Sequence, residues 1–179
     1  MEAKISCDRP QISERSAMKK VVLTSIDPCN QLYSKTDLDN ICCNLSPTEW
    51  INPHRSIIGL GNYDVNVIIA ALKIKNYDAV WFDKRNDPSC INLDGIVGFI
   101  LNIPSDCKIG NIKLPLRRRH WIAVRRVENY YYNLDSKLKN PEKIGDTDDV
   151  FKFLREQIQQ LDHRELFLVY PLNNEKCKE

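Results

Sequence analysis

Apolar residues recur every three or four positions in the first half of the chain, which is the spacing of one face of a helix. This pattern predicts three helices, over residues 16–25, 36–45 and 65–76. The second helix should begin at Thr36 or Asp37, whose side-chain oxygens can cap a helix. Its buried face should carry Leu38, Ile41, Cys42 and Leu45. The third helix should bury Val65, Ile68, Ile69 and Leu72.

The second half of the chain changes to segments rich in β-branched and aromatic residues, which favour strands. Five strands are predicted, over residues 78–83, 95–103, 119–127, 130–136 and 165–171. Before the last strand, residues 146–161 predict an amphipathic helix with an acidic first turn and a buried face of Val150, Leu154, Ile158 and Leu161. Helices followed by a run of strands predict an α+β fold, with the helical part packed beside an antiparallel sheet.

Length and composition narrow the class of protein. A chain of 179 residues without repeats fits one domain, predicted over 16–171, with a polar, flexible segment at 1–15 and a tail at 172–179. Because 26 basic residues nearly balance 24 acidic ones, nucleic acid is not expected as the main partner. Since no apolar run reaches the roughly 18 residues that span a bilayer, no membrane span is expected.

The cysteines indicate the compartment. Seven cysteines, including an adjacent pair, and no apolar signal segment fit reduced thiols inside a cell, in the cytoplasm or the nucleus. No C-x-x-C pair exists, and the three histidines are scattered. We therefore expect no metal site. No cofactor is expected either, and the protein is expected to be a monomer.

The stretch RRRHWIAVRR at 117–126 is either a basic strip for an acidic ligand or the setting of one functional histidine. In a strand, His120 would share a face with Ile122 and Val124, while Trp121 would lie on the other face. A hairpin with the strand at 130–136 brings Asp135 near His120. A turn at 127–128 places Asp135 directly opposite, and a turn at 128–129 places it diagonally, at about 4.5–8 Å between Cβ atoms.

A carboxylate beside an imidazole is the arrangement of a catalytic base and the acid that orients it. A structural His–Asp pair on a sheet surface is the alternative interpretation of the same spacing. The arginines alternate between both faces of the strand, which favours a solvated rim over a track for phosphates. A basic nucleic-acid-binding domain remains the third interpretation.

Six segments carry a family pattern: LSP at 45–47, PHRSIIGLGNYDVNVIIAALK at 53–73, AVWFDKR at 79–85, GFILNIP at 98–104, LPLRRRHWIAVR at 114–125 and YYNLDSKLKNPEKIG at 131–145. The stretch 36–171, about three quarters of the chain, resembles a Josephin domain, and in particular the small single-domain Josephins. Josephins resemble papain-like cysteine proteases and cleave ubiquitin conjugates. The resemblance implies that His120 is the general base, that Asp135 orients it, and that ubiquitin or ubiquitinated proteins are the partners. Trp121 would then wall the cleft that receives the ubiquitin tail.

The family's nucleophile lies in a pattern like Gln-x-x-x-x-Cys-Ala-x-His near the N-terminus. The matching segment here is QISERSAMK, where Gln11 takes the oxyanion-stabilising position, Ser16 replaces the cysteine and Lys19 replaces the histidine. A thiol at a helix N-terminus facing an imidazole ionises to a reactive thiolate, whereas an alcohol does not. The nearest thiols, Cys7 and Cys29, lie in the preceding segment and in a turn beyond the predicted helix.

The sequence therefore predicts a deubiquitinase scaffold whose activity is far below that of a Josephin with an intact nucleophile. Three explanations fit the degraded segment. The protein is a non-catalytic, ubiquitin-binding pseudoenzyme, another transcript encodes a different first segment, or the sequence has been altered.

Overall fold

The structure is a computed structural model that describes residues 33–47, 63–109 and 112–172. The helix predicted at 16–25 lies outside these residues, as do Gln11 and Ser16. None of the described helices is both long and apolar enough to cross a membrane.

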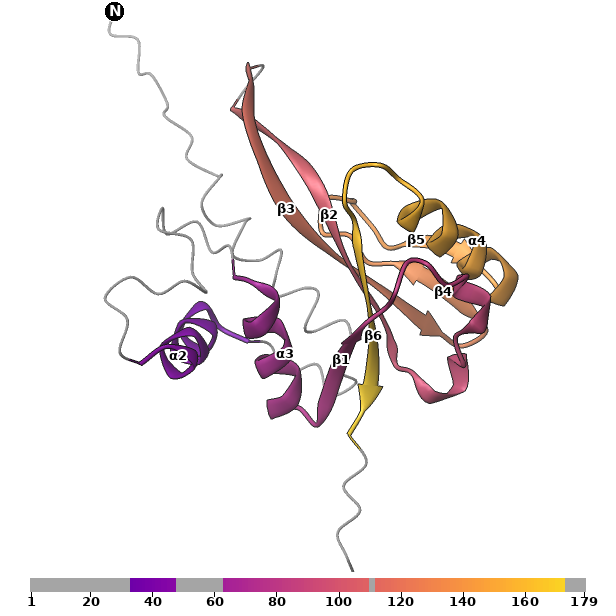
Figure 1. The fold of residues 1–179 in the computed structure, drawn as a ribbon, viewed down its shortest axis with the longest axis horizontal. Helices are drawn as coiled ribbons and strands as arrows, with labels where there is room; N and C mark the ends of the chain where they lie inside the picture. The colour runs from indigo at the N-terminus through magenta and orange to yellow at the C-terminus, as the bar shows by residue number, and fades with distance from the viewer. Residues whose placement is uncertain (1–32, 48–62, 110–111, 173–179) are drawn as a thin grey trace, which may run out of the picture.

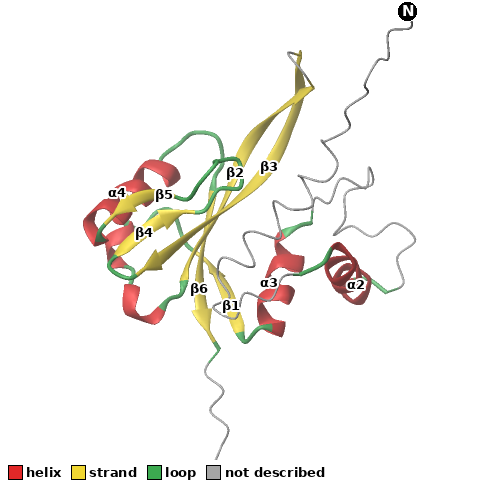
Figure 2. Ribbon diagram, turned by 180° about the vertical axis from the view of Figure 1, so that it is seen from behind, coloured by secondary structure: helices red, strands yellow, loops and turns green. Residues whose placement is uncertain are grey.

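Six strands form one antiparallel sheet in the order β1-β6-β2-β3-β4-β5 (Figure 1). Their bounds are β1 Tyr77–Trp81, β2 Gly98–Ile109, β3 Ile112–Val127, β4 Tyr130–Asn133, β5 Glu142–Gly145 and β6 Glu165–Pro171. The last strand in the chain is therefore inserted between β1 and β2. The distal part of the β2–β3 hairpin extends beyond the rest of the sheet (Figure 2).

Three α-helices pack on the sheet within the described residues: α2 Lys35–Leu45, α3 Val65–Ile74 and α4 Thr147–Ile158. Two short 3-10 helices, Pro88–Cys90 and Leu93–Gly95, connect β1 to β2. α2 and α3 lie on one side of the sheet and α4 on the other (Figures 1 and 2). This arrangement confirms the predicted α+β fold.

Each face of the sheet has its own hydrophobic core. α2 and α3 cover Ile100, Trp121, Ala123, Phe167 and Val169. On the other face, α4 covers Phe99, Leu101, Ile122, Val124, Leu166 and Leu168. Side chains of neighbouring residues point to opposite faces of a strand, so the parts of β2, β3 and β6 that these residues form are buried on both sides. The predicted separation of Trp121 from Ile122 is confirmed.

The start of α2 was predicted wrongly. Ser34 caps the helix, because its hydroxyl accepts from the Asp37 amide while the Asp37 carboxylate accepts from the Ser34 amide. This reciprocal capping box moves the start ahead of both Thr36 and Asp37. Leu38, Ile41 and Cys42 are buried as predicted, whereas Leu45 lies at the helix end and is 39% exposed.

The buried face of α3 is rotated from the prediction. Val67, Ile68, Ala71 and Leu72 are buried, while Val65 and Ile69 are only partly buried. Asp64 caps the helix by accepting from the amides of Asn66 and Val67. The helix ends earlier than predicted because Asn76 adopts a left-handed conformation, with φ of 62°, that turns the chain into β1.

The strands also differ from the prediction in length. β2 and β3 extend to residues 109 and 112, and β4 ends at Asn133 rather than residue 136. β5 was not predicted, because Glu142–Gly145 is short and lacks strand-like alternation. α4 ends at Ile158, so Leu161 is not on its buried face but 98% exposed in the turn that follows.

Candidate active site

The β3–β4 hairpin sets the position of Asp135. Val127 pairs with Tyr130, so the turn consists of residues 128 and 129, the second of the two predicted registers. Glu128 has a φ of 56°, which is the left-handed conformation that two-residue hairpin turns require. The last ladder pair joins Val124 to Asn133, and the amide of Leu134 then donates to the carbonyl of Ala123.

His120 and Asp135 are in direct contact. The His120 Nε2 atom lies 2.6 Å from the Asp135 Oδ1 atom, across 15 residues of sequence. The two side chains are 8% and 14% exposed. Burial weakens competition from water, so a charge-assisted hydrogen bond counts for more here than on an open surface. The predicted pair is therefore present in the fold.

The ionised state of Asp135 decides which nitrogen of the His120 ring carries the hydrogen. Burial raises the pKa of the carboxyl, but hydrogen bonds from His120 and the Lys137 amide outweigh it and hold the pKa below its ordinary value. An ionised carboxylate only accepts hydrogen bonds, so the shared hydrogen lies on Nε2. In the neutral ring Nδ1 then carries a lone pair, and no described residue hydrogen-bonds to it.

A local turn holds the Asp135 carboxylate. The Asn133 Oδ1 atom accepts from the Asp135 amide at 3.0 Å, which starts an Asx turn. The Asp135 Oδ1 atom accepts from the Lys137 amide at 2.8 Å, and the Asp135 carbonyl accepts from the Leu138 amide at 3.0 Å. The orienting residue thus lies in a hydrogen-bonded turn rather than in a paired strand.

The lowered pKa of Asp135 predicts a pH-dependent contribution to stability. Because the folded-state pKa lies below the unfolded value of about 3.9, the unfolded chain binds the proton more tightly. The contribution should be fully present above about pH 4 and be lost as the pH falls through the folded-state pKa. Denaturant unfolding of the wild type and Asp135→Asn should therefore differ most near neutral pH and converge in acid. A difference that does not change with pH would contradict this.

The neighbouring residue, Trp121, lies in the core. It is 5% exposed, and the centroid of its ring lies 6.0 Å from the centroid of the Phe167 ring. Across from it on β2, the buried Asn102 donates to the Glu165 carboxylate at 2.7 Å, and its Oδ1 atom has no hydrogen-bond partner among the described residues. The proposed contact between Trp121 and a ubiquitin tail stays a prediction.

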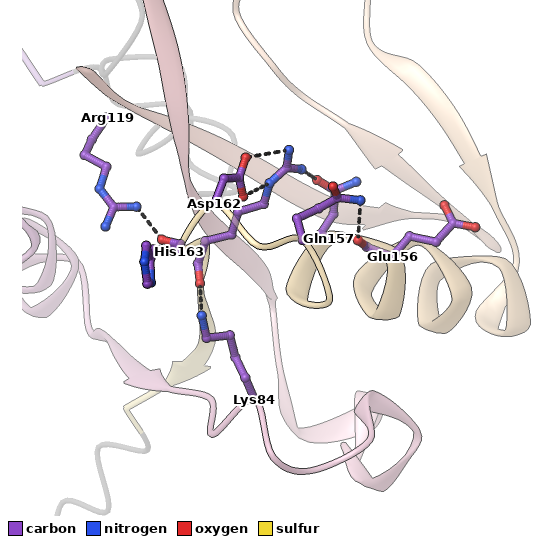
Figure 3. A network of polar contacts seen from close by, with 8 residues as sticks. Lys84, Arg119, Glu156, Gln157, Asp162 and His163 are labelled. Atoms are coloured by element: carbon purple, nitrogen blue, oxygen red, sulfur yellow. Dashed lines mark hydrogen bonds and ion pairs between the residues drawn. The ribbon is translucent and has the colours of Figure 1, made fainter. Parts of the chain in front are cut away.

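The middle of β3, next to His120, is also tied to the turn before β6 (Figure 3). Arg119 donates to the carbonyl of His163 at 2.6 Å, and Lys84 donates to the carbonyl of Arg164 at 2.7 Å. Arg164 itself pairs with Asp162 and Gln157. Arg119, one of the arginines flanking His120, thus makes a hydrogen bond to another part of the fold. The alternation of the arginines in the sequence did not indicate this contact.

Other predicted site residues cannot be placed. Gln11, Ser16, Cys7 and Cys29 lie outside the described residues, so the nucleophile segment stays a prediction. Within the described ranges, no group of three or more His, Cys, Asp or Glu side chains could hold a metal ion.

A family model described as Josephin matches residues 28–169. The chain belongs to the Josephin family. The match begins after Gln11 and Ser16, so it covers the His120–Asp135 pair but not the predicted nucleophile segment.

Relatives from animals and a plant share this region. A Josephin-like protein of Drosophila melanogaster is 54% identical over 139 residues, which is 77% of this chain and 62% of that protein. Josephin-2 of Homo sapiens is 52% identical over 130 residues, 73% of this chain and 69% of that protein. A Josephin-like protein of Arabidopsis thaliana is 41% identical over 111 residues, 60% of this chain and 29% of that protein. The aligned part thus spans about two thirds of the two animal relatives.

Proposed function

We propose that this Josephin-family chain is built to recognise ubiquitin conjugates and to hydrolyse them through a cysteine-protease mechanism. His120 is the general base, and Asp135 is the residue that orients it. The observation that carries the proposal is the buried 2.6 Å contact between His120 Nε2 and Asp135 Oδ1. Family membership supports the choice of ubiquitin as the partner. The chain acts in the cytoplasm or nucleus as a monomer, without a cofactor.

The contact assigns a task to each ring nitrogen. Nε2 donates to Asp135, so Nδ1 is the atom that can take a proton from a nucleophile. The imidazolium that forms is stabilised by the Asp135 carboxylate, and it returns the proton to the leaving amine. The ubiquitin tail enters beside His120 and Trp121, with Gln11 stabilising the oxyanion.

The nucleophile position decides how active the chain is. Ser16 stands where the family pattern has cysteine. A preformed thiolate–imidazolium pair cannot form with an alcohol, so we expect slow turnover by this chain. The same substitution favours the second candidate function, a ubiquitin-binding pseudoenzyme, because recognition uses surface beyond the reacting atoms.

Turnover of a fluorogenic ubiquitin substrate tests the catalytic assignment. The wild type should turn over slowly, Ser16→Cys should be clearly faster, and Ser16→Cys with His120→Ala should fall back to background. Robust wild-type turnover abolished by Cys7→Ala or Cys29→Ala would show that the nucleophile was misplaced. If the wild type and Ser16→Cys are equally silent, the pseudoenzyme is the better description.

Ubiquitin binding is tested separately by NMR titration of the isotope-labelled protein. Resonances around His120 should shift as ubiquitin is added, in the wild type as well as in Ser16→Cys. The absence of shifts at millimolar ubiquitin would defeat the recognition proposal. Steeply salt-dependent binding to RNA or DNA would instead support the nucleic-acid alternative.

A further inference from the structure

The strand ladder brings the chain to Asp135 but does not itself hold the carboxylate. β4 ends at Asn133, and continuing its register would set residue 137, not Asp135, opposite His120. The carboxylate therefore reaches His120 from the turn that follows the strand. The Leu134 amide ties the start of this turn to Ala123 on β3, and the other contacts described above close the turn on itself. They do not fix the far side of the turn relative to the sheet.

Lys137 makes that connection. Its amide donates to the Asp135 Oδ1 atom at 2.8 Å, and its Nζ atom donates to the Ser105 hydroxyl on β2 at 2.7 Å. Because β3 lies between β2 and the turn after β4, the Lys137 side chain crosses β3 to reach Ser105. Ser105 pairs with Arg118, and His120 pairs with Ile103, so the crossing point is two residues along β3 from His120.

We infer that Lys137 is a positioning residue, and that its two hydrogen bonds, here called the Lys137 bridge, hold the Asp135 carboxylate against His120. One end of the bridge supports the carboxylate and the other fixes the turn to the sheet. The lysine charge also favours the ionised form of Asp135. The inference rests on the proposed function for its catalytic consequence, although the bridge itself does not depend on any activity.

The bridge differs from an ordinary contact of a surface lysine. Lys137 is itself exposed, and a single hydrogen bond of an exposed lysine adds little to stability, since water competes for it. Here the same residue contacts the orienting carboxylate through its backbone and a strand 32 residues away through its side chain. A small error in the position of a catalytic group is costly, and a displacement of about 1 Å can reduce the rate by about 10²-fold.

The first readout is the NMR signal of the His120 Nε2 proton, recorded without ubiquitin. A short hydrogen bond to a carboxylate deshields this proton and slows its exchange with water. In Lys137→Met, which keeps the aliphatic stem and the backbone amide, the signal should move upfield and exchange faster. Ser105→Ala should have the same effect from the other end, and the double variant should add nothing further. Lys137→Arg should restore the signal.

Lys139→Met is the matched control, because Lys139 is an exposed lysine in the same turn region and makes no hydrogen bond or ion pair with the described residues. It should leave the His120 signal unchanged. In the Ser16→Cys background, Lys137→Met should lower kcat by up to about 10²-fold and change KM little.

The outcomes separate the two proposals. A His120 signal that is unchanged in both Lys137→Met and Ser105→Ala would overturn the bridge. If Lys137→Met does not fold, Ser105→Ala decides the question alone. If the signal responds as expected but Ser16→Cys shows no turnover, the bridge stands and the proposed function fails.

Discussion

In the Ser16→Cys background, Asp135→Ala should lower kcat by about 10²- to 10⁴-fold, which is the range lost when a catalytic histidine loses its orienting partner. The carboxylate holds the hydrogen on Nε2 and stabilises the imidazolium. Without the carboxylate, the neutral ring can carry its hydrogen on Nδ1. In that tautomer Nδ1 cannot accept a proton from the nucleophile. The measurement is steady-state turnover of a ubiquitin substrate, with kcat and KM determined separately.

Asp135→Asn is the matched control for this loss. The amide oxygen of asparagine still accepts a hydrogen bond from Nε2, so it preserves the tautomer while removing the negative charge. We expect this variant to keep much more of its kcat than Asp135→Ala. Equal losses in the two variants would mean that the charge, rather than the orientation of the ring, is the main contribution of Asp135.

The second large effect concerns stability. Leu154 on α4 is fully buried between the helix and the sheet, where it belongs to the same core cluster as Val150 and Ile158. Leu154→Ala removes buried methyl groups and leaves a cavity, so it should lower the free energy of unfolding by about 3–5 kcal/mol. Such a loss is a large part of the about 5–15 kcal/mol that stabilises a typical domain. Urea unfolding, followed by circular dichroism, measures it.

Leu161 supplies the control within the same segment. It is the same residue type but is 98% exposed, so Leu161→Ala should change stability by no more than about 0.5 kcal/mol. If Leu161→Ala were as harmful as Leu154→Ala, the helix would have to continue to residue 161 with Leu161 buried, as the sequence pattern alone predicts.

The fold was predictable where one periodic pattern dominated. The spacing of Val150, Leu154 and Ile158 identified α4, and the predicted start at residue 146 falls on Asp146, which caps the helix. The pattern failed where tertiary contacts decide. α4 stops at Ile158 although Leu161 keeps the helical spacing, and β5 forms from Glu142–Gly145 because β4 offers an edge to pair with.

The candidate site was predictable to the level of the residue pair. Hairpin spacing placed Asp135 beside His120 in either register, but the choice depended on the left-handed φ of Glu128, and glutamate is not a typical residue there. Side-chain orientation decides which ring nitrogen contacts the carboxylate, and residue spacing does not determine that orientation. Sequence reasoning missed Lys137 and Ser105. The only signal for Lys137 was its place two residues after Asp135, and nothing in the pattern marked Ser105.

The strand order constrains how the protein is made. β1 ends at Trp81, but its only partner strand in the described sheet, β6, begins at Glu165. As a ribosome synthesises the chain from its N-terminus, β1 emerges early and its hydrogen-bonding edge must wait for β6. β2 likewise lacks one neighbour until then. Nascent chains that stop before residue 165 should therefore expose unpaired strand edges and bind chaperones. Longer nascent chains, from which residue 171 has emerged, should release the chaperones.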